Sequence, residues 1–171
     1  MQKKHFNWQG LAIVFCGGFL GTISRYLLSH AIQGALGNGW PYDILLINIS
    51  GAFVLALLST LADATLFINP ARRLFLNVGF LGAYTTFSSL ALGDMTLLTS
   101  QKALLALLYL FCSICGGIIA VLLGQLIGLR IIQRVRAPYV RVADENAEQP
   151  ETSEMLAPSA SIESLQEEER L

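Results

Sequence analysis

Four long apolar runs divide most of the chain. They cover residues 11–32, 44–62, 74–93 and 103–129. Only the first run is interrupted by basic side chains, Arg25 and His30. Each run reaches the length of about 20 residues that a helix needs to cross a bilayer. The pattern therefore predicts an all-α membrane protein with four transmembrane helices.

The third run is too polar at its centre to be a plain lipid anchor. Residues 79–89 combine glycine, threonine, serine and aromatic side chains in a stretch without any charge. Non-helical backbone is tolerated at membrane depth only where protein or a water-filled cavity surrounds it. We therefore expect the third helix to be broken near its centre and to line a site.

Charge divides the chain into a basic core and an acidic end. The net charge is only −1, but nine of the 12 acidic residues lie from Asp144 onward, against one base there, Arg170. The composition of this end is typical of disorder. The sequence predicts a transmembrane domain over residues 1–136 and an acidic, disordered cytoplasmic tail over residues 137–171.

Basic residues near the span ends predict the orientation of the chain. One side carries eight of them, and the other side has only Lys102. The eight are Lys3, Lys4, Arg72, Arg73, Arg130, Arg134, Arg136 and Arg141. We expect a multi-pass protein of the inner (plasma) membrane with both termini in the cytoplasm.

Four polar residues within or beside the spans are candidates for a site, and each has a second interpretation. Arg25 either concentrates anions at an aqueous mouth or extends to the interface from the helix end. Asn48 either donates to a polar ligand or links helices. Tyr109 and Ser113 share a helix face and either line a pore or pack between helices.

The polar inventory of the spans limits the chemistry. It contains hydroxyls, amides and aromatic rings but no interior carboxylate and no catalytic or metal-binding cluster, so neither an enzyme nor a proton-coupled transporter is expected. Hydroxyl and amide donors suit a small hydrated anion, and aromatic edges are electropositive. A small multidrug-type transporter and a non-conducting scaffold subunit are alternatives, and no nucleic-acid partner is expected.

Motifs in all four spans resemble the bacterial fluoride channels called Fluc or CrcB. The longest is the stretch Gly79 to Leu90 in the third span. The others are Gly17, Gly18, Gly21, Arg25 and Tyr26; Asn48, Gly51 and Phe53; and a tyrosine in the fourth span. The resemblance implies an antiparallel dimer with two fluoride pores at its interface and a structural sodium ion at its centre.

The resemblance also implies roles for single residues. Gly82 and Thr85 would offer backbone carbonyls to the sodium ion, and Phe87 would be a pore phenylalanine. Ser88 and Ser89 would extend a polar track, and Asn48 would donate to fluoride. Tyr109, Ser113 and Arg25 complete the candidate pore set. The implied function is passive fluoride efflux across the plasma membrane, which reduces fluoride toxicity.

Three features depart from the family pattern. Ala83 replaces a glycine, and Leu90 stands where a second pore phenylalanine belongs. The strong charge bias is unlike that of an antiparallel homodimer, whose subunits insert in both orientations. These departures support the hypothesis of a heterodimer with an inverted paralogous subunit, and a homodimer stays open as the other assembly.

Overall fold

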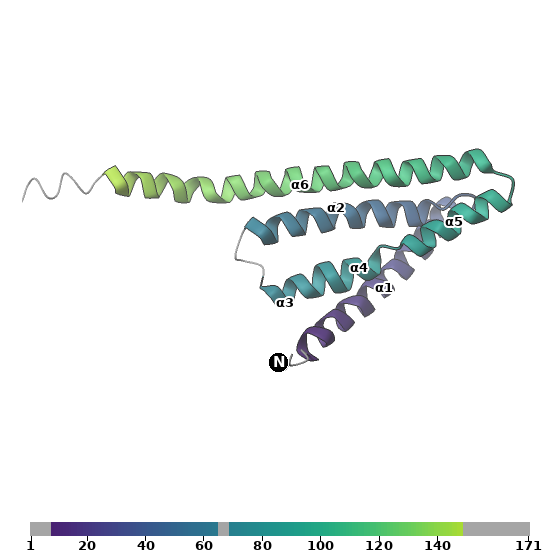
Figure 1. Cartoon of the computed structure of the whole chain (residues 1–171), viewed down its shortest axis with the longest axis horizontal. Helices are drawn as coiled ribbons and strands as arrows, with labels where there is room; N and C mark the ends of the chain where they lie inside the picture. The colour runs from purple at the N-terminus through teal and green to yellow at the C-terminus, as the bar shows by residue number, and fades with distance from the viewer. Residues whose placement is uncertain (1–7, 65–68, 149–171) are drawn as a thin grey trace, which may run out of the picture. The chain divides into compact units, whose positions relative to one another are not determined.

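The computed structural model describes residues 8–64 and 69–148, and every regular element in these ranges is a helix (Figure 1). The helices are α1 (Trp8–Leu36), α2 (Tyr42–Ala64), α3 (Pro70–Arg73), η1 (Leu74–Leu81), α4 (Gly82–Tyr84), α5 (Phe87–Thr99) and α6 (Ala103–Glu148). The described residues up to Arg130 form one compact unit, and those from Ile131 onward form a second. The candidate site lies within the first unit.

Four segments are long and apolar enough to cross a membrane, which confirms the prediction from the apolar runs. They are Trp8–Leu36, Tyr42–Ala62, Pro70–Thr99 and Ala103–Val135. Most of their large apolar side chains are exposed in the single chain, for example Phe19 and Phe111. Such surfaces are stable only against lipid or another subunit.

The third span is a series of short helices instead of one continuous helix. It starts where the Asn69 side chain accepts a hydrogen bond from the Ala71 N–H, with Pro70 at the first helical position. Residues 74–81 then form a π-helix, a form frequent near functional sites. Helix ends at Tyr84, because Thr85 and Thr86 have extended ψ angles of 153° and 120°. This confirms the predicted break near the centre.

Glycines allow α1 to pack directly against the backbone of the third span (Figure 1). A Cβ atom at Gly21 would lie 2.2 Å from the Phe80 carbonyl oxygen, and one at Gly17 would lie 2.5 Å from that of Phe75. No side chain fits in that space. Gly17 and Gly21, four residues apart on one helix face, therefore let the two backbones pack closely.

Glycines of α6 play the same part toward α2 within the first unit. A Cβ atom at Gly124 would lie 2.5 Å from the Phe53 carbonyl oxygen, and one at Gly128 would lie 2.9 Å from atoms of Thr60. The four-residue spacing of these glycines thus serves helix packing.

The acidic end is only partly described. α6 continues to Glu148, so helix extends past residue 137, where the sequence pattern suggests none. Extending an existing helix requires no new nucleation, so residues that would not start a helix can still continue one. Residues 149–171, with most of the acidic side chains, lie outside the described residues, as do Lys3 and Lys4.

Candidate functional site

The broken backbone of the third span is held by one side chain of α2. The amide nitrogen of Asn48 donates to the Thr86 carbonyl oxygen at 3.0 Å, and the Thr86 N–H donates to the Asn48 carbonyl oxygen at 2.8 Å. Both backbone groups of a residue outside helix are thereby satisfied, where each would otherwise be costly at membrane depth. Asn48 therefore links helices, and its second amide hydrogen stays available for another acceptor.

The Thr86 side chain begins the second half of the span. Its hydroxyl oxygen accepts from the Ser89 N–H at 3.2 Å, which caps α5, and lies 3.1 Å from the hydroxyls of both Ser88 and Ser89. Thr86 itself is buried. The break thus gathers Asn48, Ser88 and Ser89 into one hydrogen-bonded group around a threonine that sequence reasoning had not named as a site residue.

Because of these hydrogen bonds, two backbone N–H groups do not donate to the carbonyls that they would bond in a continuous helix. In a continuous helix the Gly82 carbonyl would accept from the Thr86 N–H, and the Thr85 carbonyl from the Ser89 N–H. Here the Thr86 N–H donates to Asn48 and the Ser89 N–H to the Thr86 hydroxyl. Gly82 and Thr85 are the residues whose carbonyls would hold a sodium ion according to the family resemblance, and oxygen is the ligand that hard cations prefer.

A glycine of α2 lets the break approach closely. A Cβ atom at Gly51 would lie 2.3 Å from the Thr85 methyl carbon and 3.1 Å from the Tyr84 ring. The Tyr84 hydroxyl also lies 3.1 Å from the Ser50 hydroxyl, within hydrogen-bond distance. Residues 48 to 51 of α2 therefore form the surface against which the broken part of the third span packs.

A polar cavity of about 460 Å³ leads from the loops that precede α2 and α6 to the break. Its lining includes Ser89 at the inner end and Lys102 in the loop before α6. The remaining lining residues are Ser29, Gln33, Asn38, Gly39, Trp40, Pro41, Asp43, Ile44, Leu92, Gly93, Thr96, Leu97 and Ser100. The cavity therefore contacts the hydroxyl cluster around Thr86 through Ser89 alone.

The cavity wall contains a buried carboxylate, Asp43, near the start of α2. Asp43 is only 3% exposed. Its Oδ2 atom accepts hydrogen bonds from the Ser29 hydroxyl at 2.5 Å and from the Gln33 amide at 2.8 Å. The position of this acid in the first turn of an otherwise apolar helix is the one sequence feature that could have marked it as a candidate. Its burial depends on α1, which the local sequence cannot show.

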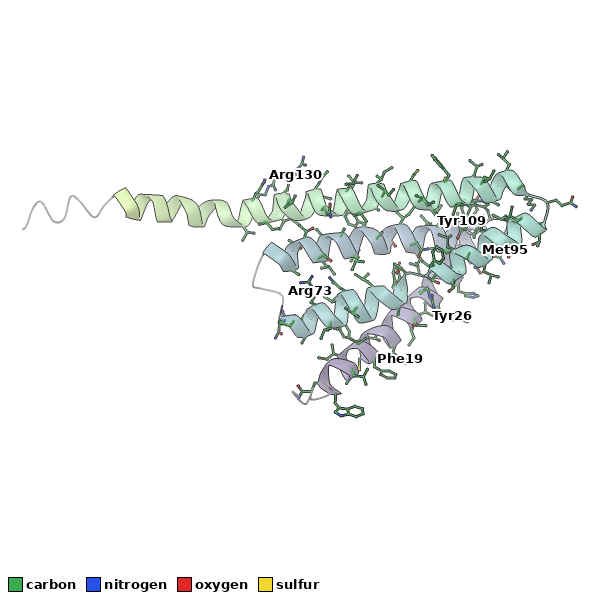
Figure 2. All side chains as sticks on the ribbon, in the orientation of Figure 1. Phe19, Tyr26, Arg73, Met95, Tyr109 and Arg130 are labelled. Atoms are coloured by element: carbon green, nitrogen blue, oxygen red, sulfur yellow. The ribbon has the colours of Figure 1, made fainter. Side chains whose placement is uncertain are left out.

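Tyr109 of α6 is fully buried against the α2 and α5 side of the bundle (Figure 2). Trp40, Leu45 and Leu90 pack against the buried cluster to which it belongs. The centroids of the Tyr109 and Trp40 rings lie 5.4 Å apart, and the rings meet edge to face. Ser113 donates to the Tyr109 carbonyl at 2.7 Å, so these two predicted site residues are joined locally. Leu90 is only partly buried and packs against the cluster that contains Tyr109.

Arg25 and Phe87 stand apart from this hydrogen-bonded group. Arg25 is half-buried on α1, and the contacts of the described residues do not join its side chain to the other candidates. Phe87 begins α5 and is 82% exposed, the most exposed large apolar side chain in the described part of the chain. Its ring thus points out of the subunit directly beside the break.

Comparison with known proteins gives a consistent result. The family model described as CrcB-like protein, camphor resistance, matches residues 12–125. A protein of Chlorobium luteolum named fluoride-specific ion channel FluC is 42% identical over 112 residues, which is 66% of this chain and 86% of the relative.

Two further relatives come from one organism, Moorella thermoacetica. Its fluoride-specific ion channel FluC 2 is 41% identical over 114 residues, 66% of this chain and 91% of the relative. Its FluC 1 is 38% identical over 108 residues, 63% of this chain and 77% of the relative. The matched region holds the described break, the cavity and all the candidate site residues, and the chain belongs to the CrcB-like family.

Proposed function

We propose that this chain is a subunit of a fluoride-selective channel that mediates passive fluoride efflux across the plasma membrane. The observation that carries the proposal is the group of Asn48, Thr86, Ser88 and Ser89 at a helix break, with Ser89 also lining a polar cavity. Relatives that cover this region are named fluoride-specific ion channels, which matches the expectation of a non-enzyme and disfavours the transporter and scaffold alternatives.

The hydroxyl and amide groups suit an anion that must give up water without being trapped. Each hydroxyl can rotate its proton toward a passing ion, and the second amide hydrogen of Asn48 can do the same. Neutral donors replace hydration but bind less tightly than several cations would. Ser88, Ser89 and Asn48 would form the inner track. Tyr109, Ser113 and Arg25 lie outside this hydrogen-bonded group, and their pore roles stay predictions.

A sodium ion fits the carbonyls of Gly82 and Thr85, because the helical donors of both carbonyls are diverted. Within the described ranges no cluster of three His, Cys, Asp or Glu side chains is present, so backbone oxygens are the ligands this region offers. The ion would supply positive charge that holds two such breaks together. Gly82 is exposed in the single chain, as a shared ion would require.

We further propose an antiparallel dimer that is completed by an inverted paralogous subunit. The exposed Phe87 ring would need a partner surface, and Leu90, which stands where the family has a second pore phenylalanine, supplies no aromatic ring. The presence of FluC 1 and FluC 2 in Moorella thermoacetica is consistent with paired subunits. A homodimer is the alternative.

Topology mapping separates the two assemblies. Expressed alone, the chain is expected to insert with both termini in the cytoplasm, because eight basic residues oppose Lys102. Accessibility of tags at each terminus, measured in intact and permeabilised cells, reads the orientation. A mixed population of both orientations, together with fluoride flux, would contradict the heterodimer.

The function is tested in cells that lack their own fluoride exporter. Expression of the chain, alone or with a paralogous partner, should restore growth in fluoride, most strongly in acidic medium, where fluoride enters as its weak acid. Growth in chloride at equal ionic strength is the control. Folded, membrane-inserted protein that leaves fluoride sensitivity unchanged in both arrangements would refute the channel function.

A further inference from the structure

Two charged residues of opposite sign line the polar cavity. They are Asp43, in the first turn of α2, and Lys102, in the loop before α6. The other residues that line this cavity are neutral, and Ser89 belongs both to the lining and to the hydrogen-bonded group around Thr86. A small ion inside the cavity therefore meets the fields of both charged side chains.

Asp43 is fixed in the cavity wall by α1. Its Oδ2 atom accepts hydrogen bonds from the Ser29 hydroxyl at 2.5 Å and from the Gln33 amide at 2.8 Å, and the residue is buried. Both donors are neutral, so they satisfy this oxygen without cancelling the charge of the carboxylate. The low dielectric constant around a buried group strengthens its field. Asp43 thus places a fixed negative charge beside the cavity.

Lys102 supplies the opposite charge from an exposed position. Its backbone is held on both sides, since its N–H donates to the Leu97 carbonyl at 3.0 Å and its carbonyl accepts from the Ala106 N–H at 3.1 Å. An exposed cation raises the local concentration of anions, and dissolved salt screens this effect. Lys102 therefore attracts to the cavity the anions that Asp43 repels.

We propose that Asp43 and Lys102 control the entry of small anions into the cavity, and with it their access to Ser89. The opposed charges have a physical use, because an ion pathway conducts only where binding is strong enough for entry and weak enough for release. A cation alone would hold a small anion in the cavity, and the carboxylate in the wall shortens its stay. The consequence for fluoride flux rests on the proposed function, whereas the entry of anions into the cavity does not.

Trp40 reports anion entry directly, because it lines the cavity and is half-buried. The only other tryptophan of the chain is Trp8, so the full chain with Trp8→Phe carries Trp40 as its single indole. The emission of this protein, purified in a neutral detergent, is quenched by iodide, by caesium or by acrylamide at a low, constant ionic strength. Iodide and caesium respond to the local potential with opposite sign, and acrylamide responds to steric access alone.

Asp43→Asn should raise quenching by iodide about twofold or more and lower quenching by caesium, because one unit charge about 10 Å away changes local ion concentrations about twofold even in water. Asparagine keeps an oxygen that can accept from Ser29 and Gln33, so the wall of the cavity stays in place. Lys102→Gln should change both quenching constants in the opposite direction. In liposomes with subsaturating fluoride, Asp43→Asn should raise fluoride flux and Lys102→Gln should lower it.

Two matched controls separate the effect of charge from that of hydrogen bonding. Ser29→Ala removes a hydrogen bond to Asp43 but no charge. Thr96→Val removes another hydroxyl of the cavity lining, one that donates to the Leu92 carbonyl. Neither substitution should change the ratio of iodide to caesium quenching.

Three results in folded protein would overturn the proposal. One is an equal ratio of iodide to caesium quenching in the parent, Asp43→Asn and Lys102→Gln proteins. Another is an equal change of this ratio in Ser29→Ala and Asp43→Asn, which would assign the effect to cavity shape. The last is a conducting protein whose fluoride flux is the same in all variants. Quenching that follows the two charges in a chain that conducts no fluoride would support the proposal and refute the proposed function.

Discussion

Replacing Asn48 by alanine is expected to reduce fluoride flux by at least about tenfold and to destabilise the subunit. The substitution leaves the N–H and the carbonyl of Thr86 without partners at membrane depth, at a cost of about 1–3 kcal/mol for each group. The break would then shift toward other conformations, and each 1.4 kcal/mol of bias changes their population tenfold. Fluoride efflux from liposomes and thermal unfolding in detergent are the measurements.

Asn77→Ala is the matched control for this effect. Asn77 lies in the third span, is also half-buried and donates to the Ser59 hydroxyl of α2 at 3.1 Å, but it supports no broken backbone. Its loss should cost only about 0.5–1.5 kcal/mol, with flux close to wild type. Equal effects of the two substitutions would show that Asn48 is an ordinary helix contact.

Replacing Phe87 by isoleucine is expected to slow fluoride flux by about two- to tenfold while leaving the subunit folded. The ring is 82% exposed, so its removal opens no cavity inside the subunit. What is lost is an electropositive aromatic edge beside the break, and such contacts contribute about 0.5–1.5 kcal/mol. Efflux rates and the oligomeric state in detergent are measured on the same preparation.

Phe19→Ile provides the comparison for Phe87. Phe19 is also a phenylalanine with a largely exposed ring, 60%, but it lies on α1 (Figure 2). Its replacement should leave flux unchanged. If Phe87→Ile also conducted at the wild-type rate with an intact dimer, Phe87 would have no pore role.

The features that depend on local pattern could be predicted from the sequence. The length of the apolar runs predicts the four spans. The polar residues at the centre of the third run predict the break near Thr85 and Thr86, because a helix that only anchors the chain in lipid would have no polar residues there. The packing of Gly17 and Gly21 follows from their spacing on one helix face. Each of these inferences uses residues that lie close together in the chain.

The features that depend on residues far apart in the chain could not be predicted from the sequence. That Asn48 would bond both backbone groups of Thr86 required knowing which turn of α2 meets the break. The burial of Asp43 depends on Ser29 and Gln33 of another helix. The π-helix over residues 74–81 has no signature in the residue pattern. Roles that need a second subunit, such as that of Phe87, stay predictions.

The most direct test of the central claim is ion efflux from liposomes that contain the purified chain, alone and together with a paralogous partner. Fluoride-selective and chloride-selective electrodes follow the two ions in parallel. The account predicts fluoride efflux from at least one of these assemblies with no chloride efflux above protein-free liposomes. Correctly folded protein that releases neither ion, or both at similar rates, would contradict it.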